Sequence, residues 1–359
     1  MQKELLREYA TRDKKDIIKS FMNILPDPDL ILKQQSGKYN EMQILRKLEY
    51  DSHLIAVKQQ RILQVSAMPW EINHQTPQIP KEIMGTDQQE AWENFNREVI
   101  NFTAPEGMED EIRDMLMRIN VDEVIEQVLD ALFYGYVVFE IMWEIRDGKI
   151  MPKALIEKPQ EWFVFDTEGI LKLKNDKGEP SPLPENKFLL VQHKARYDNP
   201  YGLRLLSRCF YPVTLKKDCT VFWAFLTEKY GMPYLIGKVT RNATKEQREN
   251  FLNGLIEMRR DAVAVIEDDE SIQIMGDTGR NESSELYKEF INFQNNEISK
   301  AILTVTLTTE LQSTGAYSAT QTHKQILDRI ALADKKLVER TINRLINTYL
   351  FLNKGGRFT

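Results

Sequence analysis

The sequence predicts an α+β protein that is mainly helical and carries one small antiparallel sheet. In most of the 359 residues, apolar side chains recur every three or four positions, the spacing of a helix with one buried face. In the middle of the chain, at about 135–195, the spacing changes to every second position, and turn signals separate short segments there. A chain of this length can bury a core large enough for one large domain or two ordinary ones.

The first 134 residues are predicted to be largely helical. Residues 1–50 are polar with a break at Pro26–Asp29, and 50–70 have apolar residues at helical spacing before 70–72 turn extended. Residues from about 88 to 134 again have a helical pattern. The apolar positions of these two helical segments are Leu54, Val57, Ile62, Val65, Ile112, Met115, Leu116, Ile119 and Val124.

The sheet is predicted from alternation. In Val137–Ile145 the odd positions are all apolar, whereas Glu140 and Glu144 fall on the opposite face. Asp147-Gly148 is a hairpin turn signal, and 170–174 and 188–193 are two further short strands.

Beyond Asn199-Pro200-Tyr201-Gly202 the helical period returns over 205–225 and ends at Gly231-Met232-Pro233. Thr244 and Gln247 form a capping box that begins a helix over 244–260. Residues 262–275 are strand-like around the acidic run Glu267–Glu270, and another helix covers 284–302.

Residues 304–318 are predicted to be a loop, because β-branched and small polar residues with one glycine do not sustain a helix interior. A long final helix then runs from Thr322 to the stop at Gly355-Gly356.

Composition argues for a cytoplasmic protein without a membrane span. The chain has a net charge of −6 and no apolar window that approaches the roughly eighteen residues of a membrane helix. Its charged N-terminus lacks the apolar region of a signal peptide, so Cys209 and Cys219 are expected to be reduced, buried thiols. An acidic chain of this kind is expected either not to contact nucleic acid at all or to meet DNA without holding it.

Catalytic motifs are absent from the sequence. There is no P-loop, no HExxH and no GxSxG, and the four histidines are scattered. We therefore predict no catalytic residue, no cofactor and no metal. One alternative stays open: a metal-dependent nuclease that uses Glu267–Glu270, although a solvated turn explains this run better, because hard cations need ligands spaced around a loop.

Several blocks, in the same order, closely resemble the portal proteins of Mu-like phages, over roughly residues 45–350. The central blocks are Asn199–Gly202, Phe222–Lys238, Asn296–Lys300 with Ile302 and Leu303, and Thr306–Glu310 with Ala319 and His323. The upstream matches are Asp51, Arg61, Trp70, Ala131–Gly135, Glu140 and Trp143. Two departures concern the pair Leu303-Thr304, where the family usually has Leu-Gly, and the end at Thr359, which implies a minimal C-terminal crown or a truncated chain.

The resemblance implies a portal fold with wing, stem, clip, tunnel loop and short crown, assembled as a dodecameric ring. It assigns 1–243 to the N-terminal region and wing, 244–302 to stem helices flanking a clip at about 261–282, 303–321 to the tunnel loop, and 322–359 to a long wing helix and the start of the crown. The two stem helices would be 244–260 and 284–302.

By this resemblance the protein is a non-enzymatic conduit for DNA packaging and ejection. The channel would be lined by Thr308, Thr309, Leu311, Gln312, Ser313, Thr314, Tyr317 and Ser318. The clip would dock partners through Val263, Val265, Glu267, Asp268, Asp269, Glu270, Ile272 and Ile274. Expected partners are further copies of the chain, the terminase large subunit, head-completion or adaptor proteins, major capsid and scaffold proteins, and duplex DNA that passes through weakly bound. The expected location is the capsid vertex of the virion, and the host cytoplasm during assembly. A capsid adaptor without a DNA channel is the remaining alternative.

Overall fold

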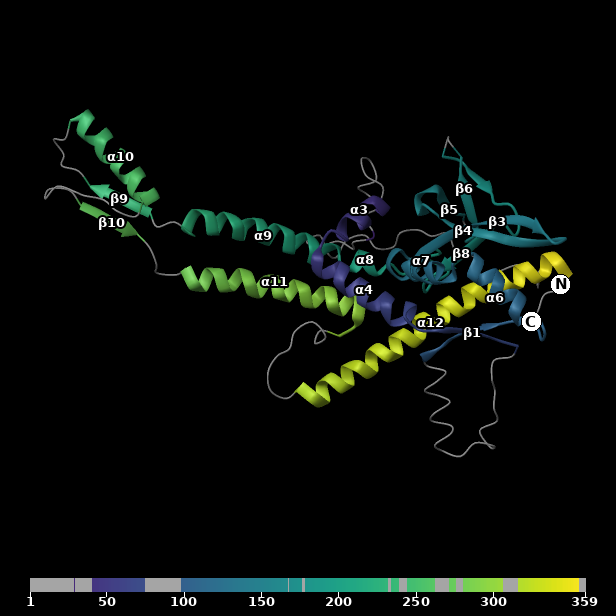
Figure 1. Ribbon diagram of the computed structural model, residues 1–359. Helices are drawn as coiled ribbons and strands as arrows, with labels where there is room; N and C mark the ends of the chain where they lie inside the picture. The colour runs from purple at the N-terminus through teal and green to yellow at the C-terminus, as the bar shows by residue number, and fades with distance from the viewer. Residues whose placement is uncertain are drawn as a thin grey trace. The chain divides into compact units, whose positions relative to one another are not determined.

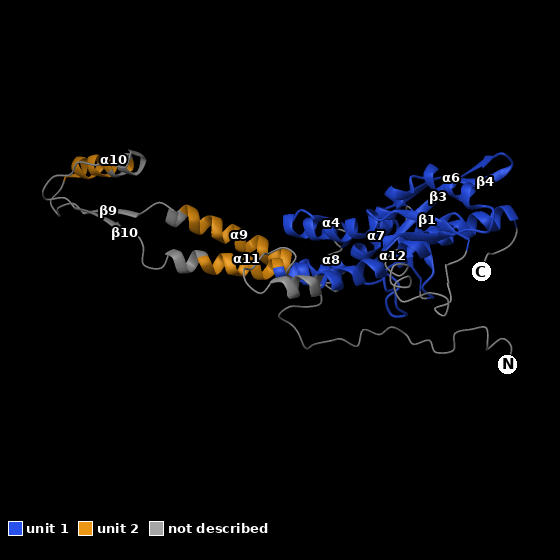
Figure 2. Cartoon of the chain, turned by 60° about the horizontal axis from the view of Figure 1, so that its bottom comes forward, with its two compact units in different colours: residues 1–211, 296–359 blue, residues 212–295 orange. Residues whose placement is uncertain are grey.

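The computed structural model describes residues 29, 41–74, 98–166, 168–175, 178–231, 234–238, 244–261, 271–275, 280–305 and 316–354. The chain divides into two compact units (Figure 2): unit 1 consists of 1–211 and 296–359, and unit 2 of 212–295. Helices and strands are mixed, and both larger sheets are antiparallel, so the predicted α+β class is confirmed. Unit 2 begins at Pro212, inside the range 1–243 that the sequence analysis assigned to the N-terminal region and wing.

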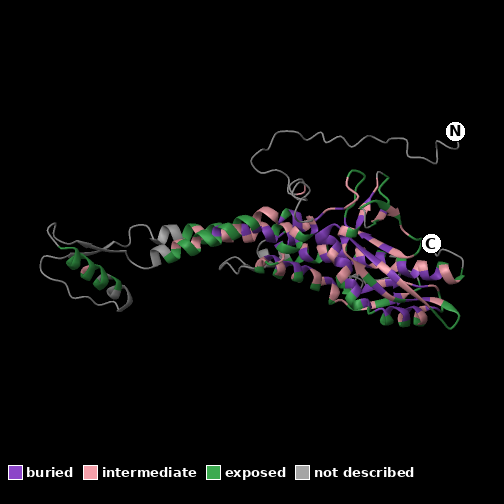
Figure 3. Cartoon of the chain, turned by 90° about the horizontal axis from the view of Figure 1, so that it is seen from above, coloured by how far each residue is buried: buried purple, intermediate pink, exposed green. Residues whose placement is uncertain are grey.

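Unit 1 contains most of the core (Figure 3, purple). Its helices are α3 (Glu41–Leu48), α4 (Ser52–Ser66), α6 (Glu109–Arg118), α7 (Val121–Tyr134), η1 (Gln160–Trp162), α8 (Leu205–Arg208) and α12 (Ala316–Lys354). Asp51 caps α4 by accepting hydrogen bonds from the backbone N–H groups of His53 (3.1 Å) and Leu54 (2.9 Å). The predicted 50–70 helix is therefore confirmed. Its start is fixed by Asp51, one of the residues on which the family resemblance rests.

The described residues of unit 1 form three sheets (Figure 1). The strands are β1 (Trp70–Asn73), β2 (Ile100–Thr103), β3 (Tyr136–Arg146), β4 (Lys149–Lys158), β5 (Phe163–Phe165), β6 (Leu171–Lys174), β7 (Pro180–Pro182) and β8 (Phe188–Gln192). They pair as a parallel β1–β2 ribbon, an antiparallel sheet β4-β3-β8 and an antiparallel sheet β5-β6-β7. The predicted sheet at 135–195 is thus present, as two antiparallel sheets.

The alternation of apolar and polar residues in β3 predicts a strand with one buried face, and this holds for only part of the strand. Residues 136–139 of this strand are all buried, because α7 packs on it and β4 and β8 flank it. Toward the hairpin the strand emerges, and Ile145 is 81% exposed. The predicted strand is confirmed. Its odd-numbered residues, which were expected to face the core, are buried only in the first part of the strand.

Helix α12 supplies hydrogen-bond partners to strand edges. Glu339 accepts from Asn101 N and Asn343 accepts from Thr103 N, both at 2.9 Å. Two residues along a strand advance about 6.6 Å and four along a helix about 6 Å, so the two elements run in step. The edge of β2 is thereby satisfied without a third strand.

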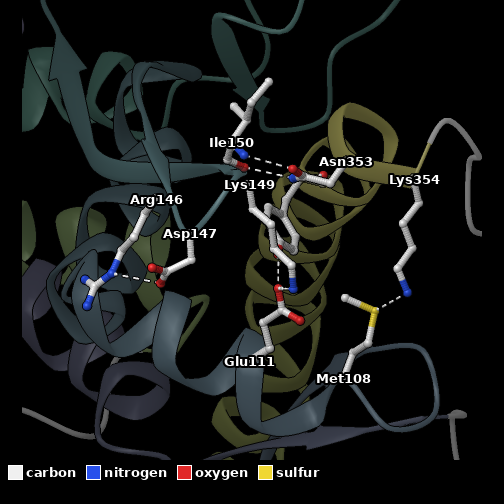
Figure 4. Close-up of polar contacts among 9 residues, drawn as sticks. Met108, Glu111, Arg146, Asp147, Lys149, Ile150, Asn353 and Lys354 are labelled. Atoms are coloured by element: carbon white, nitrogen blue, oxygen red, sulfur yellow. Dashed lines mark hydrogen bonds and ion pairs between the residues drawn. The ribbon is translucent and has the colours of Figure 1, made fainter.

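The far end of α12 does the same for β4 (Figure 4). Asn353 accepts from Ile150 N and donates to Ile150 O, each at 2.8 Å, as a neighbouring strand would. Nearby, Glu111 accepts hydrogen bonds from Lys149 Nζ (2.6 Å) and from the Tyr349 hydroxyl. The last helix is therefore fastened to the β3–β4 hairpin and to α6.

Unit 2 contains two long helices, α9 (Phe210–Gly231) and α11 (Arg280–Leu303), which cross its boundaries and lie side by side in Figures 1 and 2. Cys219 Sγ lies 3.9 Å from Tyr287 O between them. Between these helices in the chain come β9 (Tyr234–Lys238), α10 (Lys245–Asp261) and β10 (Ser271–Met275), with β9 and β10 antiparallel. The capping box is confirmed: Gln247 N donates to Thr244 Oγ1 and Thr244 N donates to Gln247 Oε1.

Three sequence predictions of local structure were wrong. Ile100–Thr103 is a strand rather than part of a helix, since its β-branched and aromatic residues run into Pro105, which ends the extended segment before α6. The final helix begins at Ala316 instead of Thr322, so Tyr317 and Ser318 are helical and not part of a loop. Alanines at 316 and 319 outweigh the hydroxyl residues between them. Finally, α11 begins at Arg280 rather than at residue 284.

Candidate functional site

Two glycines from separate blocks of the resemblance touch backbone to backbone. Gly135 ends α7 with φ +89°, and Gly202 closes the turn before α8 with φ +76°. A Cβ on Gly202 would lie 2.4 Å from Gly135 O and 2.6 Å from His193 O, and a Cβ on Gly135 would lie 2.4 Å from Tyr201 O. Only glycine fits at either position, which gives both blocks a structural role.

The turn at Asn199–Gly202 is fixed by side chains. Asn199 Nδ2 donates to Gly202 O at 2.8 Å, and Gln192 Nε2 donates to Pro200 O at 2.6 Å. His193 Nδ1 lies 2.9 Å from Leu203 O, and burial lowers the pKa of this imidazole. The neutral His193 is therefore a structural hydrogen-bond donor, as expected for a histidine without nearby catalytic partners.

A buried ion pair joins three helices next to the predicted tunnel loop. Arg61 on α4 donates to Asp334 on α12 from Nε (2.8 Å) and Nη2 (3.1 Å). Its Nη1 donates to Ile302 O at the end of α11. Both side chains are almost fully buried, so losing one partner would leave an uncompensated charge. This junction, defined by Arg61, Asp334 and Ile302, fixes both helices that border 306–315.

Beside this junction, Thr304 follows the last residue of α11 with φ +60°. A β-branched residue in the left-handed region is an outlier, since its side chain crowds the backbone. The sequence departure from Leu-Gly to Leu303-Thr304 therefore falls where the backbone favours glycine.

A second buried charge cluster lies between α4, α7 and β4. Lys58 Nζ pairs with Glu49 (2.6 Å) and Asp130 (2.8 Å) and lies 5.0 Å from the centre of the Phe133 ring. Burial alone would lower the pKa of Lys58, but the two carboxylates outweigh it and raise this pKa. Burial, together with the charge of Asp130, raises the pKa of Glu157 to about 7.

Unit 2 exposes large apolar side chains on both of its long helices. On α11, Leu286, Phe290 and Phe293 are spaced four and three residues apart and so lie on one face, with exposed fractions of 66%, 39% and 55%. On α9, the exposed apolar residues are Leu215, Val221, Phe222 and Phe225. We call these two sets together the apolar stripes; they leave more apolar surface in water than scattered side chains do.

Most predicted site residues fall outside the described residues. This holds for Thr308, Thr309 and Leu311–Thr314 of the tunnel loop and for Val263, Val265 and Glu267–Glu270 of the clip. Ile272 and Ile274 are in β10, opposite Gly237 and Leu235 of β9. Tyr317 and Ser318 are in the first turn of α12. The two predicted sets thus stay predictions, apart from the backbone of these four residues.

Sequence reasoning missed Asp334, the partner of Arg61. A signal was present: Asp334 comes four residues after Ile330 and three before Leu337, both on the predicted apolar face of the last helix. An acid on such a face is typical of a buried ion pair.

Within the described ranges, no group of three or more His, Cys, Asp or Glu side chains could hold a metal ion. Nor does any helix among those residues have the length and apolar character needed to cross a bilayer.

Comparison with known proteins places these features in a family context. The family model described as the portal protein of Mu bacteriophage matches residues 42–358. The portal protein of Escherichia phage Mu is 27% identical over 230 residues, which is 63% of this chain and 44% of that protein. The Mu-like prophage FluMu protein gp29 of Haemophilus influenzae is 23% identical over 301 residues, 82% of this chain and 53% of that protein. The chain thus spans about half the length of these curated relatives.

Two solved structures are similar in fold. A chain from the virion of a native gene transfer agent particle aligns with a TM-score of 0.61 at 12% identity and covers 92% of this chain and 87% of its own length. A chain from the neck of an empty particle of that agent aligns with a TM-score of 0.51 at 14% identity, over 68% and 70%. At these identities the likeness concerns the fold alone.

Proposed function

Because the chain belongs to the family of Mu bacteriophage portal proteins, we propose that it is a structural subunit of a ring at the capsid vertex. The ring is the conduit for DNA during packaging and ejection, and it docks the terminase large subunit and the head-completion proteins. The family is not one of enzymes, which removes the reason to consider a nuclease built on Glu267–Glu270. The virion is the final location of the protein, after assembly in the host cytoplasm with capsid and scaffold proteins.

The apolar stripes of unit 2 are the observation that carries this proposal. An isolated chain would leave Phe222 and Phe225 about 60% exposed, together with the three apolar residues of α11. A neighbouring copy that covers them removes this surface from water, at about 25 cal/mol per Å². In a closed ring every copy has a neighbour that covers its apolar stripes, whereas an open chain of copies leaves the stripes of its end copies exposed.

The two long helices also suit the stem of such a ring. At about 1.5 Å per residue, the 22 residues of α9 and the 24 residues of α11 extend about 33 and 36 Å. We therefore assign the stem to α9 and α11 and the clip to the part of the chain between them, including α10. This proposal differs from the sequence-based assignment of 244–260 as the first stem helix, and it is supported by the contact between Cys219 of α9 and Tyr287 of α11.

The test is a charge placed in one stripe. Phe225→Glu is expected to prevent ring formation, because each interface would then bury an unpaired carboxylate. Thr220→Glu is the matched control: Thr220 is exposed on the same helix, outside the stripe, and its hydroxyl donates to Lys216 O. Full-length protein would be produced with its capsid and scaffold partners and examined by mass measurement and electron microscopy.

Rings from wild type and Thr220→Glu but not from Phe225→Glu would support the proposal. Normal rings from Phe225→Glu would show that the apolar stripes are not the interface between copies. A wild type that stays monomeric with its partners present would contradict the ring itself.

A further inference from the structure

The end of α11 is held in place by buried contacts with α4 and α12. Ile302 O is the acceptor to which, in an uninterrupted helix, the N–H four residues later would donate. Here the Arg61 guanidinium donates to that carbonyl, and Asp334 holds the guanidinium with two further hydrogen bonds. A carbonyl oxygen can accept two hydrogen bonds, so Arg61 does not block the next turn, but it fixes the end of α11 where the structure shows it.

Thr304 and Val305 favour opposite conformations at the end of α11. Thr304 is exposed and strained at φ +60°, and a helical conformation would relieve that strain. Val305 N donates to no acceptor among the described residues, whereas a longer helix would pair it with Ala301 O. Against this, Leu303 and Val305 are 0% and 4% exposed, so moving Val305 would expose a buried side chain.

We propose that the end of α11 is a two-state latch. In the short state, which the structure shows, the helix ends at Leu303, Thr304 is left-handed, Val305 is buried and Arg61 caps Ile302 O. In the long state the helix continues past Leu303, Thr304 is right-handed and Val305 N donates to Ala301 O. Thr304 is a positioning residue: its conformation decides whether α11 ends at Leu303. The latch stands on these contacts alone, and its use in DNA passage rests on the proposed function.

Two substitutions bias the latch in opposite directions. Val305→Ala weakens the anchor of the short state and raises helix propensity, so it favours the long state. Thr304→Gly removes the left-handed strain and lowers helix propensity, so it favours the short state. The double variant Thr304→Gly/Val305→Ala should therefore behave like wild type.

The measurement is amide hydrogen exchange at residue 305 in the full chain, corrected for intrinsic rates. Val305→Ala is expected to slow this exchange about tenfold, and Thr304→Gly in the same chain to restore it. A substitution that merely loosened the core would instead speed the exchange, so the direction separates the two explanations. Unchanged or faster exchange in Val305→Ala, or no reversal in the double variant, would overturn the latch.

Position 348 serves as the control for glycine itself. Thr348 is inside α12 and donates to Arg344 O at 2.9 Å, so Thr348→Gly should lower stability whereas Thr304→Gly should raise it. Equal losses at both positions would also contradict the strain at Thr304. DNA retained per particle is a separate readout: slowed exchange with normal DNA content supports the latch and counts against a channel role for 306–315.

Discussion

Replacing Gly202 with alanine tests the backbone contact between the two glycine blocks. The new Cβ would lie 2.4 Å from Gly135 O and 2.6 Å from His193 O, separations that real Cβ atoms essentially never show. Both atoms are backbone, so neither can move without shifting α7 or β8. Overpacking of this kind costs about 1–3 kcal/mol, and the left-handed φ of +76° adds about 1–2 kcal/mol. We expect a total loss of about 3–4 kcal/mol.

Gly148→Ala is the control, because it isolates the backbone conformation from the contact. Gly148 has the same φ of +76°, but no atom lies within 4 Å of the added Cβ. Only the strain of about 1–2 kcal/mol should remain. For a unit of this size 1 kcal/mol corresponds to about 2–4 °C, so thermal unfolding should show a fall of about 10 °C for Gly202→Ala and about 4 °C for Gly148→Ala. Equal shifts for the two variants would refute the argument from the close approach.

Three further predictions concern polar contacts of unit 1. The pKa of Glu157 is raised to about 7, so the folded chain holds this proton more tightly than the unfolded chain. Stability should therefore be greatest below pH 4.5 as far as this group is concerned, and decline as pH rises through 7; Glu157→Gln should flatten that decline in denaturant midpoints measured across pH. Asp334→Ala leaves Arg61 buried without its carboxylate and should cost about 3–5 kcal/mol in chemical unfolding, against a small effect for Glu285→Ala, which removes an exposed helical ion pair. Asn353→Ala should cost about 1–2 kcal/mol by freeing Ile150 N and O, and Asn353→Asp should cost at least as much, because it sets a carboxylate oxygen against Ile150 O; a smaller loss in Asn353→Asp would contradict the strand-like pairing.

The predictions that held rest on local rules. The capping box at Thr244 and Gln247, the hairpin turn at Asp147-Gly148 and the alternating strand after Tyr136 each depend on neighbours in sequence, and each is present. The family, too, was recognisable from blocks of residues in order, several of which prove to be structural: Asp51 caps a helix, and Gly135 and Gly202 allow a close approach.

By itself, therefore, the sequence determined the α+β class, the central strands and the family, because period, turn chemistry and short motifs act over a few residues. Only the tertiary structure decided that Ile100–Thr103 is a strand, that α9 rather than α10 lies beside α11, and that Arg61 meets Asp334. Each of these depends on a partner far along the chain: β2 needs the side chains of α12, and a buried arginine needs an acid 273 residues away. Local propensity carries no information about such a partner, since the free energy of pairing appears only when the two segments meet.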